Sequence, residues 1–215
     1  MVCKYLKRRS VTSRHAILLQ LLVSFLREAG MQPIPEARTE NGERPDLRLS
    51  LDGVPLLLDV SVTHPTMPSA RSSGRSSHAL GAARQREYEK MHKYAELGVM
   101  EGATVVPLVM ESTGALGEGL RQFVSRISSR VRDGEFAGAS PSVIERFLTS
   151  ALAIALQRGN AAILREGASQ LDYSRSSDPQ HQRSSTRVYR TFRATVTTPS
   201  RLARHLGEVM TLVEQ

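Results

Sequence analysis

Two apolar runs joined by the pair Asp52-Gly53 constrain the fold of this chain more than any other segment. Residues 46–51 alternate between polar and apolar side chains, which predicts a half-buried strand. Residues 54–62 are more continuously apolar, which predicts a buried strand. Asp-Gly is a preferred pair for a two-residue hairpin turn, so we expect an antiparallel β-hairpin here.

Two carboxylates lie on this predicted hairpin, Asp46 at the start of the first strand and Asp59 near the end of the second. Each stands six residues from its own turn residue, which makes them near neighbours across the ladder. A charge among so many apolar neighbours is costly to bury unless it faces a cation or a metal. Two adjacent carboxylates also repel each other. We therefore expect Asp46 and Asp59 to hold a hard ion, Mg²⁺ or Mn²⁺.

A plainer interpretation stays open for each acidic residue. Asp46 could cap a turn after Pro45, and Asp59 could pair with a buried arginine. Glu36, on the segment after the first predicted helix, is a candidate third metal ligand or an exposed edge residue.

If such a metal site acts in phosphodiester hydrolysis, it also needs a cation near the attacking water or the scissile phosphate. The position two residues after Asp59 is Ser61, which carries no charge. The helix predicted at 78–97 offers lysines instead, because Lys90 and Tyr94 share a helical face with Glu87, and Lys93 stands one step aside. We expect Lys90 or Lys93 to point into the site; the alternative is a solvated helix with Glu–Lys pairs.

The remaining patterns predict the other elements of an α/β (α+β) domain with a small mixed sheet. We expect the order helix, strand, strand, strand, helix, strand, followed by C-terminal helices. The first predicted features are a helix at 14–29 with Ser13 as N-cap and Gly30 as its stop, an edge strand or no strand at 33–37, a loop at 64–77, and a strand at 103–110 in which Pro107 indicates an edge position or a terminal bulge. They are followed by helices at 120–132 and at 142–167 with a break at Gly159-Asn160, a disordered stretch at 170–186, a weak strand at 187–196 and a helix at 201–213.

These elements suggest three regions. Residues 1–12 form a basic extension, residues 13–167 the domain, and residues 168–215 a Ser/Arg-rich tail that is partly disordered. A formal net charge of +8 favours a polyanionic partner, of which nucleic acid is the commonest. A single cysteine excludes an internal disulfide and a zinc site built on paired cysteines.

Other classes of protein fit the sequence poorly. No apolar run approaches the length of a membrane span, and the basic N-terminus does not resemble a signal peptide, so we expect an intracellular location with the nucleus as one option. We find no HExxH motif, no phosphate-binding glycine loop and no Gly-x-Ser-x-Gly elbow. His15, His64 and His92 are each expected to be a cap or a surface residue.

The ordered motifs resemble the PD-(D/E)XK (restriction-endonuclease-like) nuclease superfamily. The resemblance rests on Arg44-Pro45-Asp46, a spacer, Asp59-Val60-Ser61-Val62-Thr63-His64-Pro65, and the downstream segments at 89–94 and 106–114. It is closest to the endonuclease-like C-terminal segment of reverse-transcriptase-bearing, non-long-terminal-repeat retroelement proteins, and covers roughly residues 14–165. Ser61 departs from the superfamily pattern, which has lysine there.

The resemblance implies a magnesium-dependent endonuclease acting on DNA. It implies Asp46 and Asp59 as metal-binding catalytic residues, Glu36 as a further acidic ligand, Lys90 or Lys93 as the catalytic lysine and Tyr94 as a phosphate contact. Arg44, Ser61, Arg71 and Arg75 are expected on the substrate side. No reverse transcriptase motif is found here, so that enzyme would come from another chain or a missing portion. The alternatives are a catalytically silent nucleic-acid-binding module and a structural remnant.

Overall fold

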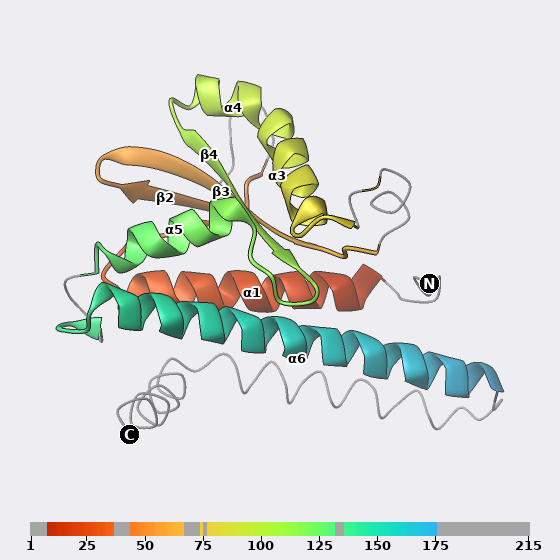
Figure 1. The fold of residues 1–215 in the computed structure, drawn as a ribbon. Coiled ribbons are helices and arrows are strands. Elements are labelled where there is room, and N and C mark those ends of the chain that lie inside the picture. The colour runs from red at the N-terminus through yellow and green to blue at the C-terminus, as the bar shows by residue number, and fades with distance from the viewer. Residues whose placement is uncertain (1–7, 37–43, 67–73, 75–76, 132–135, 176–215) are drawn as a thin grey trace. The chain divides into compact units, whose positions relative to one another are not determined.

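The computed structural model describes residues 8–36, 44–66, 74, 77–131 and 136–175 of the chain (Figure 1). The chain divides into two compact units, residues 14–158 and residues 1–13 together with 159–215. The hairpin, the sheet and the predicted site all belong to the unit formed by residues 14–158.

The elements follow the predicted order of helix, three strands, helix, strand and further helices, which confirms the α+β class. They are α1 (Arg8–Glu28), β1 (Ile34–Pro35), β2 (Leu47–Leu51), β3 (Val54–Thr63), α3 (Gly81–Lys93), α4 (Ala95–Met100), β4 (Thr104–Glu111), α5 (Glu118–Ser128) and α6 (Pro141–Arg175).

The predicted hairpin is confirmed in its position, its direction and its turn. Strands β2 and β3 pair antiparallel, and Leu51 faces Val54 across the two-residue turn. Both turn residues have positive φ, 56° at Asp52 and 77° at Gly53. A type I′ turn requires this conformation, and Asp-Gly supplies it at low cost. The local sequence therefore sets the register of the hairpin.

The four strands form one mixed sheet in the order β1-β2-β3-β4. Strand β1 pairs antiparallel with β2, and β3 pairs parallel with β4 after the crossover through α3 and α4. Strand β3 therefore lies inside the sheet and β4 at its edge. The edge position of β4 agrees with Pro107, which has no backbone N–H to donate to a second neighbour.

Helices cover the sheet on both sides (Figure 1). Leu57 of β3 and Val105 of β4 pack in one buried cluster with Tyr94 and Leu97, so α3 and α4 cover the face that carries these residues. Because side chains alternate along a strand, the buried Leu56 and Leu58 point to the other face. Figure 1 shows α1 on that other side.

Helix α1 buries the predicted apolar stripe and ends as predicted at Gly30. Of the stripe, all but Ile17 are buried, namely Leu18, Leu21, Leu22, Phe25 and Leu26. Gly30 has φ 77°, and Met31 N donates to Leu26 O at 2.8 Å, which is the Schellman arrangement for a helix end. The prediction of Ser13 as N-cap is wrong, since α1 begins at Arg8 and Ser13 lies within it.

Three other boundaries differ from the prediction. The helix expected at 78–97 is two helices, because the backbone leaves helical geometry at Tyr94 with φ −104°. No break occurs at Gly159-Asn160, where α6 continues to Arg175, past the predicted onset of disorder at 170. The uninterrupted helix at Gly159-Asn160 shows that residue propensity alone can misplace a helix end.

Contrary to the prediction that no apolar run approaches the length of a membrane span, the stretch Pro141–Ser169 of α6 is long and apolar enough to cross a membrane by length and composition, with a mean hydropathy of 1.3. The core helix of a soluble protein passes the same test. Within residues 141–158, buried side chains recur at helical spacing, at Ile144, Leu148, Leu152, Ala155 and Leu156. This pattern is that of a helix packed along one face.

Several predictions fall on residues outside the described ranges. They are the arginines Arg71 and Arg75 of the predicted loop, the strand at 187–196, the helix at 201–213 and most of the stretch predicted to be disordered.

Candidate active site

Asp59 is a buried carboxylate on β3, the strand between β2 and β4. Its side chain points to the face covered by α3, since it lies two residues after Leu57 and therefore on the same face of the strand. The residue is 3% exposed. A carboxylate buried this deeply must be hydrogen-bonded or paired with a cation.

Helix α3 supplies that cation through Lys90. The Lys90 Nζ lies 2.8 Å from Asp59 Oδ1 and 2.7 Å from Oδ2, so the ammonium contacts both oxygens. One turn further along, the Tyr94 hydroxyl donates to Oδ1 at 2.9 Å. Ser61, two residues after Asp59 on the same strand face, donates to Oδ2 at 3.1 Å. The carboxylate thus has four contacts from three side chains.

Lys93, the other candidate lysine, contacts Tyr94 and not the Asp59 carboxylate. Its Nζ donates to the Tyr94 hydroxyl at 2.9 Å and lies 4.3 Å from the centre of the tyrosine ring. Lys93 is exposed, whereas the Lys90 side chain is 13% exposed. Lys90 is therefore the lysine that contacts the carboxylate, and Lys93 is linked to Asp59 only through Tyr94.

Asp46 immediately precedes β2. Leu47 pairs with Leu58, so the hairpin brings Asp46 to the part of β3 that follows Leu58. The Val60 backbone N–H donates to Asp46 Oδ2 at 2.7 Å. His15 of α1 donates from Nε2 to the same oxygen at 3.0 Å, because a carboxylate only accepts. The side chain of Asp46 is 22% exposed.

The prediction of His15 as a cap or a surface residue is wrong, since it lies inside α1 with its side chain 34% exposed and contacts Asp46. Its hydrogen bond to Asp46 raises the pKa of the imidazole, against burial, which lowers it. The charges of Asp46 and Asp59 and the backbone of Val60 also raise this pKa, so both carboxylates lie close enough to act on His15. The only sequence signal was a histidine near the start of a helix, which is too common to assign a role.

Glu36 and Arg44 stay at the margin of the site. The Glu36 backbone N–H donates to the Asp46 carbonyl at 3.0 Å, which joins the segment after β1 to the segment before β2. The residue is exposed and has φ 49°, a left-handed conformation just beyond β1. Arg44 is also exposed. No described contact joins the side chain of either residue to the Asp46 or Asp59 carboxylate.

The donor set suits a hard divalent ion held by few protein ligands. Within the described ranges, no group of three or more His, Cys, Asp and Glu side chains is arranged to hold a metal ion, so Glu36 does not complete a cage. Mg²⁺ commonly binds through one or two carboxylates together with substrate phosphates and waters. Asp46 and Asp59 are two such carboxylates, and Lys90 already contacts both oxygens of Asp59.

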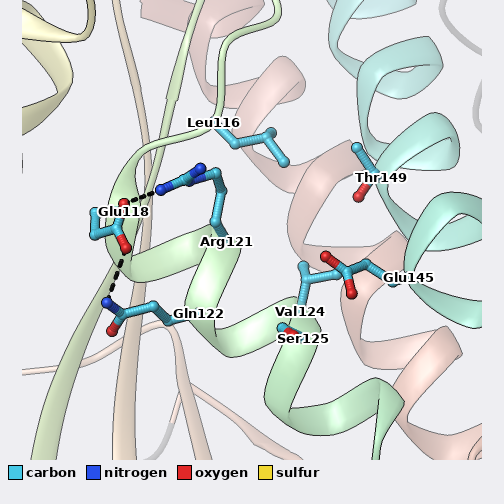
Figure 2. Close-up of a pocket in the computed structure, with 8 residues that line it drawn as sticks. All are labelled: Leu116, Glu118, Arg121, Gln122, Val124, Ser125, Glu145 and Thr149. Atoms are coloured by element: carbon cyan, nitrogen blue, oxygen red, sulfur yellow. Dashed lines mark hydrogen bonds and ion pairs between the residues drawn. The ribbon is translucent and has the colours of Figure 1, made fainter. Parts of the chain in front are cut away.

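A second feature in this unit is a groove between α5 and the start of α6, of about 370 Å³ (Figure 2). It is lined by Leu116, Glu118, Arg121, Gln122, Val124, Ser125, Glu145 and Thr149. Figure 2 shows Arg121 and Gln122 turned toward Glu118, to which both donate. These polar groups satisfy one another on an exposed helix surface, so the groove offers less reactive chemistry than the buried Asp59 cluster.

Comparison of this chain with protein-family models and with curated proteins finds no match.

Proposed function

We propose that this chain is a metal-dependent endonuclease that hydrolyses phosphodiester bonds in DNA, with a site of the PD-(D/E)XK type. The observation that carries the proposal is the Lys90 ammonium on both oxygens of Asp59, with a second carboxylate, Asp46, held by the backbone N–H of the next residue, Val60. The main departure from the superfamily pattern is Ser61 in the position of the usual lysine, and Lys90 from helix α3 supplies a lysine at Asp59 instead.

Each side chain has a distinct task in this proposal. Asp46 and Asp59 would hold Mg²⁺, and a bound Mg²⁺ supplies a more acidic water and neutralises charge on a phosphate. Lys90 holds a positive charge at the carboxylates, where it can stabilise negative charge that develops on the attacking water or the phosphate. Ser61 and Tyr94 hold Asp59 in one orientation. Tyr94 is 3% exposed, so it supports Asp59 rather than contacting a phosphate directly.

The basic character of the chain supports nucleic acid as the substrate. A net charge of +8 favours association with the phosphate backbone, independent of sequence. The resemblance to endonuclease segments of retroelement proteins supports DNA, and a reverse transcriptase on another chain as a partner.

The test is nicking of supercoiled plasmid over a titration of Mg²⁺ or Mn²⁺. We expect Asp46→Asn and Asp59→Asn, which keep the side-chain shape, each to lower nicking by about 100-fold or more, because general acid–base and metal chemistry of this kind contributes that much. Glu145→Gln, a carboxyl change in the groove of Figure 2, is the matched control and should nick like the native protein. Nicking by Asp59→Asn at the native rate would remove the proposal.

A lysine transfer sharpens this test. Ser61 lies on the same face of β3 as Asp59, where the superfamily carries its lysine. We expect Lys90→Gln to lose nicking, and the double variant Ser61→Lys with Lys90→Gln to regain part of it, since the second lysine replaces the first at Asp59. A Lys90→Gln variant that nicks normally would show that the lysine has no catalytic role.

A second candidate is a catalytically inactive nuclease-like module that binds nucleic acid. It is favoured by the complete pairing of Asp59, whose two oxygens are satisfied by Lys90, Tyr94 and Ser61 with no ion needed. Tight DNA binding that is unchanged by metal, together with no nicking at any metal concentration, would select this candidate over the endonuclease.

A further inference from the structure

The two carboxylates of the site are not equivalent. Both oxygens of Asp59 accept hydrogen bonds from side chains, as described above. Asp46 receives both of its contacts, from Val60 N–H and His15 Nε2, on the single oxygen Oδ2. Its Oδ1 takes no hydrogen bond from the described residues, and the side chain is partly exposed. Asp46 Oδ1 is therefore the oxygen that can accept a new ligand without breaking an existing contact.

The orientation of Asp46 depends on having two donors at one oxygen. The terminal torsion of an aspartate is broad, so one hydrogen bond leaves the carboxylate free to rotate about its last bond. The Val60 donor comes from the backbone of β3 and is kept in any side-chain variant. His15 supplies the second donor, and among described side chains it is the one that contacts the Asp46 carboxylate.

We propose that His15 is a positioning residue that fixes the Asp46 carboxylate with Oδ1 turned to the divalent ion and Oδ2 anchored. This inference rests on the proposed function, because it assigns a role within the same site. His15 is not a ligand here, since its Nε2 already donates to Oδ2. It acts across the fold, because α1 carries the imidazole and the β2–β3 hairpin carries the carboxylate.

The experiment compares His15→Leu with His15→Gln, because the glutamine amide nitrogen can reach about as far as Nε2 and donate to the same oxygen. Two quantities are measured, Mn²⁺ affinity without DNA by calorimetry, and plasmid nicking as a function of Mn²⁺. We expect His15→Leu to bind Mn²⁺ about tenfold more weakly, as for other residues that orient metal ligands. Nicking at saturating metal should change little, and His15→Gln should restore most of the affinity.

His92→Leu is the control, since His92 is exposed on α3 and contacts Tyr88 instead. If His15→Leu does not fold, His15→Gln and His15→Asn carry the test, because both are amides and asparagine is too short to reach Asp46. Equal Mn²⁺ affinity in that pair would overturn the inference.

The outcomes separate this inference from the proposed function. Metal binding that depends on His15, in a chain that never nicks DNA, overturns the endonuclease and supports the positioning role. Nicking with the same metal dependence in native and His15→Leu protein supports the endonuclease and overturns the positioning role of His15. A native chain that neither binds Mn²⁺ nor nicks DNA overturns both.

Discussion

At the scale of single residues, the Asp59–Lys90 pair is the contact with the largest expected effect on stability. The Asp59 side chain is buried and that of Lys90 is partly buried, 5% and 13% exposed. Removing one partner of a buried ion pair leaves an uncompensated charge and costs about 3–5 kcal/mol. We expect Lys90→Met to lower the free energy of unfolding by about that amount, as measured by urea denaturation.

The double variant Lys90→Met with Asp59→Asn provides the control, because it removes the orphaned charge and keeps the shape. It should recover at least half of the loss. If the double variant is as unstable as Lys90→Met alone, packing of the lysine stem and not its charge is the source of the effect.

His15 predicts a pH dependence at the same scale. Its pKa is raised in the folded chain by Asp46, so the stabilisation from this pair is fully present below the ordinary histidine pKa, near 6.5. It is lost as the pH rises through the raised pKa of the folded state. The stability difference between native protein and His15→Gln should therefore shrink as the pH rises through that range.

Nuclear magnetic resonance titration of the His15 imidazole measures the cause directly. Asp46→Asn should lower the pKa of His15, because it removes the negative charge and the strongest hydrogen-bond acceptor. An unchanged pKa in that variant would show that Asp46 does not act on His15 in solution.

The positions of Asp46 and Asp59 could be predicted from the sequence, whereas the roles of Lys90 and His15 could not, for physical reasons. The Asp52-Gly53 turn fixes the register, so the neighbourhood of Asp46 and Asp59 follows from counting. The choice between Lys90 and Lys93 depends on how α3 is rotated over the sheet, which the Leu57–Tyr94 packing sets and no local pattern reveals. His15 contacts a residue 31 positions away, so only the tertiary fold identifies it.

At the scale of elements, the start of α5 packs closely against β4 and α3 at two glycines, Gly117 and Gly119. The Gly119 N–H donates to Glu87 Oε1 at 2.9 Å. A Cβ at Gly119 would lie 2.4 Å from the Pro107 carbonyl oxygen, which is backbone. A Cβ at Gly117 would lie 2.4 Å from Glu87 Oε1, which is the end of a side chain, and 3.0 Å from the Val109 carbonyl oxygen.

We therefore expect Gly119→Ala to destabilise the chain by about 2–3 kcal/mol, because the backbone of β4 cannot move aside cheaply. Gly117→Ala should cost less, and adding Glu87→Ala should relieve part of the Gly117→Ala effect but little of the Gly119→Ala effect. Thermal denaturation of the four variants measures this. Equal relief in both backgrounds would contradict the geometry.

The elements themselves were largely predictable because their patterns are strong. The apolar stripe from Leu18 to Leu26 and the Gly30 stop are local signals, and the structure uses both. The junction at Tyr94 was not predictable, because its hydroxyl is held by Asp59 while its ring packs with Leu57 and Leu97. A tertiary contact, not helix propensity, decides where α3 ends.

At the scale of the whole molecule, the positive charge predicts how the proposed binding to DNA depends on salt concentration. Binding through phosphate contacts releases counterions, so affinity should fall steeply and linearly on a log–log plot of binding constant against salt concentration. Fluorescence anisotropy with two unrelated duplexes of equal length should give the same slope, and Asp59→Asn should bind as tightly as the native chain. A flat salt dependence would remove the electrostatic mode of binding.

The outer edge of the sheet at β4 has a consequence for self-association. Pro107 offers no N–H there, the Val109 carbonyl already accepts from Gly117, and the Glu111 N–H already donates to Ala115. Fibril growth needs a free row of backbone groups on which an incoming strand can template. At Val109 and Glu111 part of that row is already used by the chain itself, so this margin is a poorer template for amyloid-like stacking.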